Sequence, residues 1–209
     1  MKILITDDHA VVRHGLKRIL GEEFKDTTFG EACNAQEALE LAGRQKWDVA
    51  ILDLSLPGRG GLEALREIRT QHPDLPVIVF SMYPEEQFAT RALKAGASGY
   101  LTKESAPEQM AAAVLKVLSG GHYVSPALAE KLAADVGRGW SRDPHETLSD
   151  REFEIMQMIG RGKTVTGIAQ ELSLSIKTVS TYRARILEKM QLKTTAELIR
   201  YVVERGLAS

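Results

Sequence analysis

The sequence predicts two domains, a doubly wound α/β domain over residues 1–121 and a small all-helical domain over residues 148–209. The first prediction rests on short apolar runs that alternate with helical periods, the pattern of a parallel sheet covered by helices on both faces. The second rests on apolar residues at helical spacing with no strand-like run between them. Residues 122–147 predict a linker, because they include the turn-rich segment GRGWSRDPHET, and residues 126–136 fit a short helix within it.

Five strands and five helices are expected in the first domain. Several strand candidates are nearly continuous Val, Ile, Leu and Phe, as expected for strands buried on both faces. The strands are expected at residues 2–6, 27–32, 49–54, 77–81 and 99–101. The helices are expected at residues 11–20, 35–44, 61–71, 85–95 and 107–119. Gly96 follows the fourth helix as a natural helix stop.

Four helices are expected in the second domain. Ser149 and Glu152 have the spacing of a capping box, which starts a helix that runs through Ile159 and is stopped by Gly162. Two helices follow at residues 165–172 and 176–190, joined by the turn Ser-Leu-Ser. The last helix begins at a cap on Thr194 or Thr195, ends near Arg205 and is stopped by Gly206.

Composition and charge narrow the class of protein. The net charge is −1, but residues 1–121 carry 14 basic against 17 acidic side chains (−3), while residues 148–209 carry 10 against 7 (+3). A mildly acidic half joined to a mildly basic half fits a regulatory part beside a nucleic-acid-binding part. The single cysteine, Cys33, excludes a disulfide within the chain and is expected to be a buried hydrophobe. No run approaches the roughly 20 apolar residues of a membrane span, and a signal-peptide pattern is absent, so a cytoplasmic protein is expected.

Acidic, hydroxyl and basic residues lie at the carboxyl ends of four of the five expected strands. Parallel strands end at the same edge of a sheet, so these side chains are expected to converge. Taken singly, an acid pair at a strand end is a turn or a helix cap, and a lone lysine is solvated. The combination at four strand ends indicates a site instead. Its members are Asp7, Asp8, Asp53, Ser81 and Lys103.

Three converging carboxylates repel one another unless a cation lies among them. Oxygen ligands favour Mg²⁺, which takes few protein carboxylates and fills its other positions with water and phosphate. A carboxylate beside Mg²⁺ can attack a phosphoryl group and become an acyl phosphate. Mg²⁺ and the Lys103 ammonium would stabilise charge on the transferring oxygens, and the Ser81 hydroxyl can donate to one of them. The set therefore predicts a phosphorylation pocket.

The motifs ILITDDH, DVAILDLSLPGRGGLEALREIR, VIVFS and KAGASGYLTK make residues 1–121 resemble the receiver domain of two-component response regulators. The resemblance implies that Asp53 is the phosphoacceptor, with Mg²⁺ held by Asp7, Asp8, Asp53 and the main-chain carbonyl of Ser55. It also implies a phosphate switch formed by Ser81, Tyr100 and Lys103. Glu104 stands where the family commonly has proline, which puts the shape of this loop in doubt.

The segment from Val165 onward reads as helix, turn and helix. Apolar residues lie on one face of each helix: Ile168, Ala169 and Leu172 on the first, and Val179, Tyr182, Ile186 and Met190 on the second. The other face of the second helix is polar or small and would fit a DNA major groove with Lys177, Ser180, Thr181, Ala184 and Arg185. Contacts to DNA phosphates are expected from Thr166, Lys177, Thr178, Arg183 and Lys189. On pattern alone, a small helical bundle with a solvated polar face remains an alternative.

The stretch LSDREFEIMQMIGRGKTVTGIAQELSLSIKTVSTYRARILEKMQLKTTAELIRYV resembles the LuxR-type DNA-binding domain. Joined to a receiver, it is typical of the NarL/FixJ subfamily of response regulators. Tyr182 stands where histidine is frequent in that family. The resemblance implies a sensor histidine kinase and double-stranded promoter DNA as partners, a homodimer at least after phosphorylation, and RNA polymerase as a further candidate partner. The final helix, with Leu198, Tyr201 and Val202, is a candidate protein–protein surface unless these residues belong to the core.

Three functions are compatible with these sequence features. The leading one is a transcription regulator switched by phosphorylation of Asp53. The alternative is a constitutive DNA-binding regulator that uses the receiver only to dimerise. An enzyme, a Mg²⁺-dependent phosphohydrolase with Asp53 as nucleophile, would need an acid two residues later to act on the leaving group, and Ser55 stands there. We therefore expect no enzyme.

Overall fold

The computed structural model describes residues 1–57, 60–105, 107–137 and 143–207. The described chain divides into two compact units, Met1–Ala134 and Asp135–Ser209. Much of the turn-rich segment GRGWSRDPHET, including Trp140, lies outside the described residues. The expected domain limits at residues 121 and 148 stay predictions.

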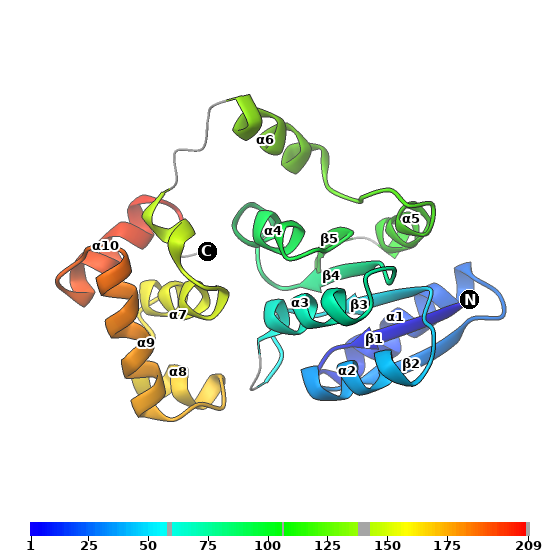
Figure 1. Cartoon of the computed structure of the whole chain (residues 1–209), viewed down its shortest axis with the longest axis horizontal. Coiled ribbons are helices and arrows are strands. Elements are labelled where there is room, and N and C mark those ends of the chain that lie inside the picture. The colour runs from blue at the N-terminus through cyan, green and yellow to red at the C-terminus, as the bar shows by residue number, and fades with distance from the viewer. Residues whose placement is uncertain (58–59, 106, 138–142, 208–209) are drawn as a thin grey trace. The chain divides into compact units, whose positions relative to one another are not determined.

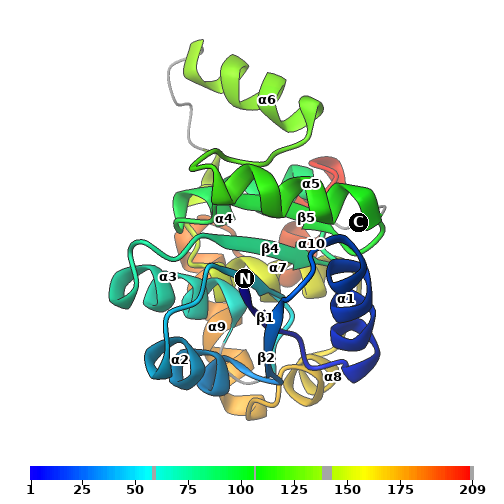
Figure 2. The same ribbon diagram turned by 90° about the vertical axis from the view of Figure 1, so that its right-hand side faces the viewer.

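The first unit is built on a five-stranded parallel sheet with the order β2-β1-β3-β4-β5, which confirms the predicted doubly wound fold (Figure 1). The strands are β1 (Lys2–Thr6), β2 (Thr28–Ala32), β3 (Val49–Leu52), β4 (Val77–Ser81) and β5 (Gly99–Thr102). The helices are α1 (Ala10–Glu23), α2 (Ala35–Arg44), α3 (Gly61–Gln71), α4 (Glu85–Lys94) and α5 (Pro107–Leu118). Figure 2 shows α1 on one side of the sheet and α2 and α3 on the other.

Burial on both faces explains the apolar composition of the inner strands. Ile3, Leu4 and Ile5 are consecutive in β1 and all fully buried, although their side chains alternate between the two faces. One face packs against apolar residues of α1 and α5 in a single cluster that includes Leu16 and Val114. The edge strand β2 is only partly buried, because one of its sides has no neighbouring strand.

Element ends lie within two residues of their expected positions, except the end of α1. Strand β3 ends at Leu52 instead of residue 54, so Asp53 begins the loop that leads to α3. Helix α1 continues three residues beyond the expected end, to Glu23. Gly96 has φ of +100°, which confirms it as the residue that lets the chain leave α4.

The expectation that Cys33 is buried is wrong. Its side chain is exposed, and its Sγ lies 3.1 Å from Glu37 Oε1. Cys33 directly follows β2, where its main-chain N–H also donates to the Glu37 carboxylate at 2.8 Å. This contact raises the pKa of the Cys33 thiol, so the neutral form is favoured.

The second unit is helical, as predicted. Helix α6 (Pro126–Gly137) spans the division between the units, and a short 3₁₀ helix η1 (Pro144–Thr147) precedes the rest. The remaining helices are α7 (Asp150–Gly160), α8 (Val165–Glu171), α9 (Ile176–Lys189) and α10 (Thr195–Glu204). Helix α7 packs against α9 and α10, and α8 packs against α9.

Side-chain caps fix where these helices begin. Both expected capping boxes are present, Ser149 with Glu152 at α7 and Thr194 with Glu197 at α10. Ser175 caps α9 by accepting the main-chain N–H of Thr178 at 3.0 Å. The turn between α8 and α9 passes through Ser173, whose φ is +53°. These caps define a helix-turn-helix with the predicted limits to within one residue.

The apolar residues predicted from helical spacing to face inward lie in the core of the second unit. Ile168 of α8, together with Val179 and Ile186 of α9, is fully buried. Leu198 and Val202 of α10 are also fully buried, so core packing accounts for them and not a protein–protein surface. None of the helices within the described residues is both long enough and apolar enough to cross a membrane.

Gly160 allows α7 and α10 to approach closely, since a Cβ at this position would lie 2.2 Å from Val202 Cγ1. We expect Gly160→Ala to lower the free energy of unfolding of the second unit by ~1–3 kcal/mol through overpacking. The matched control is Gly167→Ala in α8, where the nearest neighbour is Thr164 Oγ1 at 3.4 Å. Thermal unfolding of both variants checks the expectation, and equal melting temperatures would contradict it.

Candidate functional site

The acidic side chains that follow β1 and β3 meet at one edge of the sheet. Asp7 and Asp53 are each 1% exposed, and the main-chain N–H of Asp53 donates to the Thr6 carbonyl at 2.9 Å. Lys103 comes from the end of β5, where its N–H donates to the Ser81 carbonyl at 2.8 Å. Its ammonium lies 2.8 Å from Asp53 Oδ2 and 2.6 Å from Asp7 Oδ2. Three of the five predicted pocket residues are therefore in direct contact.

Asp8 and His9 form the open side of this pocket. The Asp8 side chain is 33% exposed, and its Oδ1 lies 2.7 Å from His9 Nδ1. The His9 main-chain N–H donates to Asp7 Oδ1 at 2.9 Å, which orients that carboxylate. Ligand atoms of Asp7, Asp8 and His9 all lie within 4.8 Å of one another.

Burial and charge act in opposite directions on the central pair. Burial raises the pKa of Asp53, and the nearby Lys103 ammonium only partly offsets this. Burial works to lower the pKa of Lys103, but Asp53 and Asp7 more than offset it, so this pKa lies above its ordinary value. With Asp8, the pocket holds three carboxylates and one ammonium, a formal charge of −2 that a divalent cation would neutralise.

The donor set fits Mg²⁺. Asp7 Oδ2 is buried and makes no well-directed hydrogen bond within the described part of the chain, despite its short distance to Lys103. An oxygen that is close to one cation but not satisfied can serve as a metal ligand. The Ser55 N–H donates to Asp53 Oδ1 at 3.1 Å, which brings the Ser55 peptide beside the carboxylate.

A glycine holds the loop after Asp53 in place. A Cβ on Gly61, the first residue of α3, would lie 2.4 Å from both the Asp53 carbonyl oxygen and Leu54 Cα. The Gly61 N–H donates to the Leu54 carbonyl at 3.1 Å. This close approach lets the start of α3 fix the backbone that carries Asp53.

Two of the three predicted switch residues, Ser81 and Tyr100, both make hydrogen bonds to Tyr83. Ser81 is fully buried, and its Oγ accepts the main-chain N–H of Tyr83 at 3.2 Å. Tyr100 is 1% exposed, and its hydroxyl donates to the Tyr83 carbonyl at 2.8 Å. Burial raises the pKa of Tyr100, which keeps this donor protonated. Sequence reasoning missed Tyr83, because its main chain makes these contacts.

The loop after Lys103, which carries Glu104 where proline is common, forms a turn. The Ser105 N–H donates to the Thr102 carbonyl at 2.9 Å. The departure from the family pattern leaves Lys103 at the pocket.

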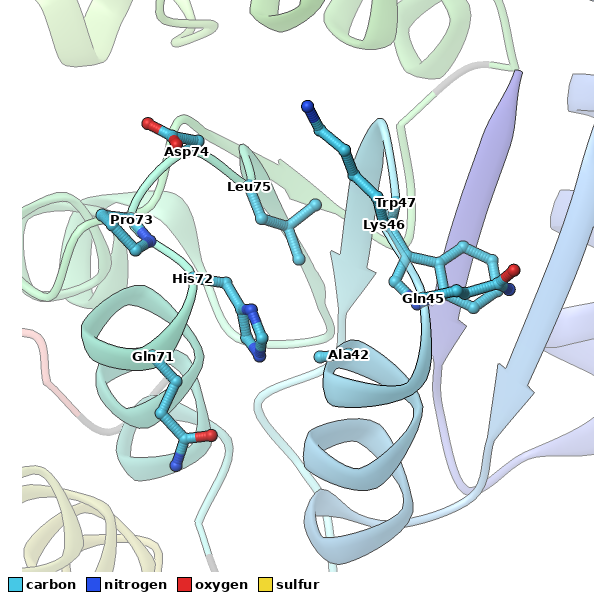
Figure 3. A pocket seen from close by; sticks show the side chains of 9 residues that line it. All are labelled: Ala42, Gln45, Lys46, Trp47, Gln71, His72, Pro73, Asp74 and Leu75. Atoms are coloured by element: carbon cyan, nitrogen blue, oxygen red, sulfur yellow. The ribbon is translucent and has the colours of Figure 1, made fainter.

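A separate hollow of about 220 Å³ lies at the opposite edge of the sheet, lined by Ala42 and by residues 45–47 and 71–75, which precede β3 and β4 (Figure 3). In Figure 3 the His72 ring points from the end of α3 toward Ala42. Its Nε2 finds no hydrogen-bond partner among the residues that the structure describes. The acidic pocket lies at the carboxyl ends of the strands, where Asp53 follows β3. This hollow lies at their amino ends and is therefore a different site.

Eight of the nine predicted DNA-contacting residues lie in α9, and Thr166 lies in α8. The exposed ones are Thr166, Lys177, Thr181, Ala184, Arg185 and Lys189, and the half-buried ones are Thr178, Ser180 and Arg183. Two hydroxyls already have partners in this segment, since Thr181 donates to the Lys177 carbonyl and Thr178 pairs with Ser175, the cap of α9.

Lys189 also has a partner. Its ammonium lies 2.6 Å from Glu152 Oε2, and the Ser149 N–H donates to the same oxygen at 2.7 Å. Burial works to raise the pKa of Glu152, but Lys189 and Ser149 more than offset it, so this carboxyl is ionised. The contact ties α9 to α7. Contact of Lys189 with DNA stays a prediction and would require this ion pair to open or be shared.

Comparisons with known proteins agree with both halves of the chain. The family model for the response regulator receiver domain matches residues 3–115, and the model for bacterial regulatory proteins of the luxR family matches residues 146–202. The chain is 39% identical to the response regulator GacA of Pseudomonas aeruginosa over 208 residues, which is 99% of this chain and 97% of GacA. It is 34% identical to the response regulator UvrY of Escherichia coli over 210 residues, 100% of this chain and 96% of UvrY.

Solved structures are similar over two thirds of the chain or nearly all of it. RcsB of Salmonella enterica serovar Typhimurium, bound to the promoter rprA in the presence of phosphomimetic BeF₃⁻, has 27% identity and a TM-score of 0.65, with 97% of this chain and 98% of that chain covered. A LuxR-family response regulator from Aurantimonas sp. has 36% identity and a TM-score of 0.60 over 66% of this chain and 98% of its own. The chain therefore belongs to the NarL/FixJ family of response regulators, with a receiver domain followed by a LuxR-type DNA-binding domain.

Proposed function

We propose that this protein is a transcription regulator in which a sensor histidine kinase phosphorylates Asp53 and thereby controls DNA binding by α9. The observation that supports this most strongly is the Lys103 ammonium shared by two buried carboxylates, Asp53 and Asp7. A buried carboxylate beside a fixed cation is suited to accept a phosphoryl group, because the cation offsets the charge that arrives.

Mg²⁺ is the cofactor of the proposed reaction. Asp7, Asp8, Asp53 and the main-chain carbonyl of Ser55 would hold it. When bound, Mg²⁺ supplies positive charge beside the transferring oxygens. The protein itself keeps the carboxylates of Asp7 and Asp53 buried away from water. The His9 N–H orients Asp7, and the Ser55 N–H orients Asp53.

Asp53 is the nucleophile of the transfer. One carboxylate oxygen forms the O–P bond while the N–P bond of a kinase phosphohistidine breaks, and the electron pair of that bond returns to the imidazole. Lys103 remains protonated, because its pKa is raised, and pairs with the oxygens. Ser55 cannot act as the acid or base that rapid hydrolysis requires at this position. The protein therefore stores the phosphoryl group as a signal and is not proposed to turn over a metabolite.

The switch would act through Tyr83. When a phosphoryl oxygen arrives, the Ser81 hydroxyl turns to donate to it, and the Tyr83 N–H loses its present acceptor. Tyr100 then loses part of the support for its bond to the Tyr83 carbonyl. Tyr83 is stacked on Phe88 of α4, with ring centroids 4.3 Å apart, so a shift of Tyr83 reaches α4. The result is a population shift between two arrangements of this segment.

A hydrogen bond connects the start of α4 to the residue that precedes α6. Glu85, the first residue of α4, accepts the main-chain N–H of Ser125 at 3.2 Å, and Ser125 Oγ accepts the Leu128 N–H at 3.1 Å. Ser125 thus begins α6 while held by α4. Movement of Glu85 after phosphorylation would loosen the start of α6, which leads toward the DNA-binding domain.

DNA binding would place α9 in a major groove. Lys177, Thr181 and Arg185 lie on its exposed side near the N-terminal half and middle of the helix, where base edges are reached in helix-turn-helix proteins. Base contacts are proposed for Lys177, Ser180, Thr181, Ala184 and Arg185, and phosphate contacts for Thr166, Lys177, Thr178, Arg183 and Lys189.

A homodimer is proposed because one small helix buries too little surface for tight specific binding. The solved structures of RcsB include two RcsB dimers bound to two parallel DNAs. RNA polymerase is proposed as a further partner at promoters. The function requires a cytoplasmic protein, because the promoter DNA lies there.

Treatment with acetyl phosphate and Mg²⁺ tests the switch. We expect wild-type protein to gain one phosphoryl group and to bind its promoter about 5–150-fold more tightly, an ordinary coupling of ~1–3 kcal/mol. Asp53→Asn should show neither change, whereas Asp48→Asn, at the opposite edge of the sheet, should behave as wild type. Intact mass and footprinting provide the two readouts. A donor-induced rise in DNA affinity in Asp53→Asn would contradict the proposal, and phosphorylation without any rise would favour the constitutive alternative.

Salt dependence of DNA binding tests the role of α9. Lys177→Ala should reduce the slope of log affinity against log salt by about 1, because one phosphate contact releases fewer counterions. The matched control is Arg200→Ala, which removes an exposed cation of α10 that pairs with Glu204. Fluorescence anisotropy at several salt concentrations measures both slopes. Equal slopes in the two variants would contradict the assignment of Lys177.

Hydrogen exchange at the Ser125 amide tests the connection between α4 and α6. Glu85→Ala should speed this exchange in the unphosphorylated protein, whereas Glu85→Gln, which keeps an acceptor oxygen, should stay near wild type. Phosphorylation of the wild type should speed it as well. Protection of the Ser125 amide that is unchanged by phosphorylation would show that the signal leaves the receiver by another route.

A further inference from the structure

Arg13, which no sequence pattern singled out, is bonded to the backbone of the acidic turn. It lies in the first turns of α1, and its side chain is 15% exposed. Its Nη1 donates to the main-chain carbonyl of Asp7 at 2.7 Å. Its Nε donates to Glu31 Oε2 at 3.1 Å. One guanidinium thus bridges the acid turn and the edge strand of the sheet.

Glu31 holds the Arg13 guanidinium from a fixed position in the sheet. It lies in β2 in register with Ile5 of β1, so its backbone is fixed by the sheet. Its other carboxylate oxygen accepts the Lys17 ammonium at 2.6 Å. Lys17 and Arg13 together hold the pKa of Glu31 below its ordinary value, with Lys17 the larger influence. The carboxylate therefore stays ionised and keeps the guanidinium in one orientation.

The carbonyl that Arg13 holds belongs to the peptide between Asp7 and Asp8. Because this peptide joins the two acidic residues, its orientation limits the directions that both side chains can take. Carboxylate oxygens of Asp7 and Asp8 lie within 4.8 Å of one another, and their mutual repulsion favours separation of the two side chains when no metal is bound. A bond from a fixed donor to this carbonyl opposes that separation without placing a new charge among the carboxylates, because Glu31 pairs with Arg13.

We propose that Arg13 is a positioning residue for the metal site, acting through the Asp7 carbonyl and held by Glu31. The inference rests on the proposed function of the pocket as a Mg²⁺ site. The planar guanidinium supplies two donors at a fixed angle to two acceptors, and the single ammonium of lysine does not reproduce that geometry. Loss of the bridge frees the acid turn and weakens metal binding more than it changes the phosphoryl transfer of a loaded pocket.

The test is Mn²⁺ binding to the unphosphorylated full-length protein, followed by the electron paramagnetic resonance signal of free Mn²⁺. Mn²⁺ is a suitable probe because it takes the same oxygen ligands as Mg²⁺. Arg13→Ala should weaken binding by about ten- to hundredfold, the usual effect of removing a group that supports a metal ligand. Arg13→Lys, a milder change to the fold, should weaken binding in the same direction, and so should Glu31→Gln to a smaller extent.

The matched control is Arg18→Ala. Arg18 lies on the same helix, is 82% exposed and pairs only loosely with Glu22, at 3.6 Å. It should bind Mn²⁺ as wild type does. In addition, the rate of phosphorylation by acetyl phosphate in Arg13→Lys should approach the wild-type rate at saturating Mg²⁺ and fall below it at low Mg²⁺. A role limited to helix stability would not produce this split.

The outcomes separate the two proposals. Wild-type affinity for Mn²⁺ in both Arg13 variants would overturn the positioning role and leave the pocket's function standing. A wild-type protein that bound neither Mn²⁺ nor Mg²⁺ would overturn the proposed function, and the role of Arg13 with it.

Discussion

The pairing of one ammonium with two buried carboxylates is the interaction on which the receiver depends. Asp7 and Asp53 are almost completely buried, and isolated carboxylates in such a place would be strongly disfavoured. Lys103 makes their burial tolerable, and the parallel sheet makes the contact geometrically available, because all three residues follow strands that end at one edge. The remaining negative charge suits the pocket to the divalent cation that the proposed function requires.

The surrounding contacts connect this pocket to the rest of the molecule in two directions. On one side, Arg13 and Glu31 tie the acid turn to the edge strand β2, which would keep the proposed metal site in one geometry. On the other, Ser81 and Tyr100 both hold Tyr83, and Glu85 holds the start of α6. The contacts of Arg13 and Glu31 resist movement of the acid turn. The contacts of Tyr83 and Glu85 can transmit a movement from the pocket to the start of α6. A switch needs a rigid binding site as well as a movable connection, because a freely moving site would bind its ligand without displacing α4 or α6.

The sequence predicted the fold, the helix caps and the convergence of the pocket residues, because these follow from local periodicity and from the rule that parallel strands end together. The pairing of Asp53 with Lys103 could be expected on that basis. The roles of Tyr83 and Arg13 could not, because each depends on a main-chain group whose position only the folded chain defines. The pairing of Lys189 with Glu152 was missed for a similar reason, since 37 residues separate the two. Cys33 was placed wrongly because composition alone carries no information about the direction of one side chain at a strand end.

The proposed switch requires that the acidic pocket and α9 be thermodynamically coupled. Coupling is reciprocal, so promoter DNA must change the affinity of the pocket for a phosphoryl mimic by the same factor by which the mimic changes DNA affinity. The most direct measurement is a titration of beryllofluoride with Mg²⁺, with and without saturating promoter DNA. We predict tighter beryllofluoride binding in the presence of DNA, by a factor equal to the rise in DNA affinity that beryllofluoride causes. Identical beryllofluoride affinities with and without DNA would contradict the account.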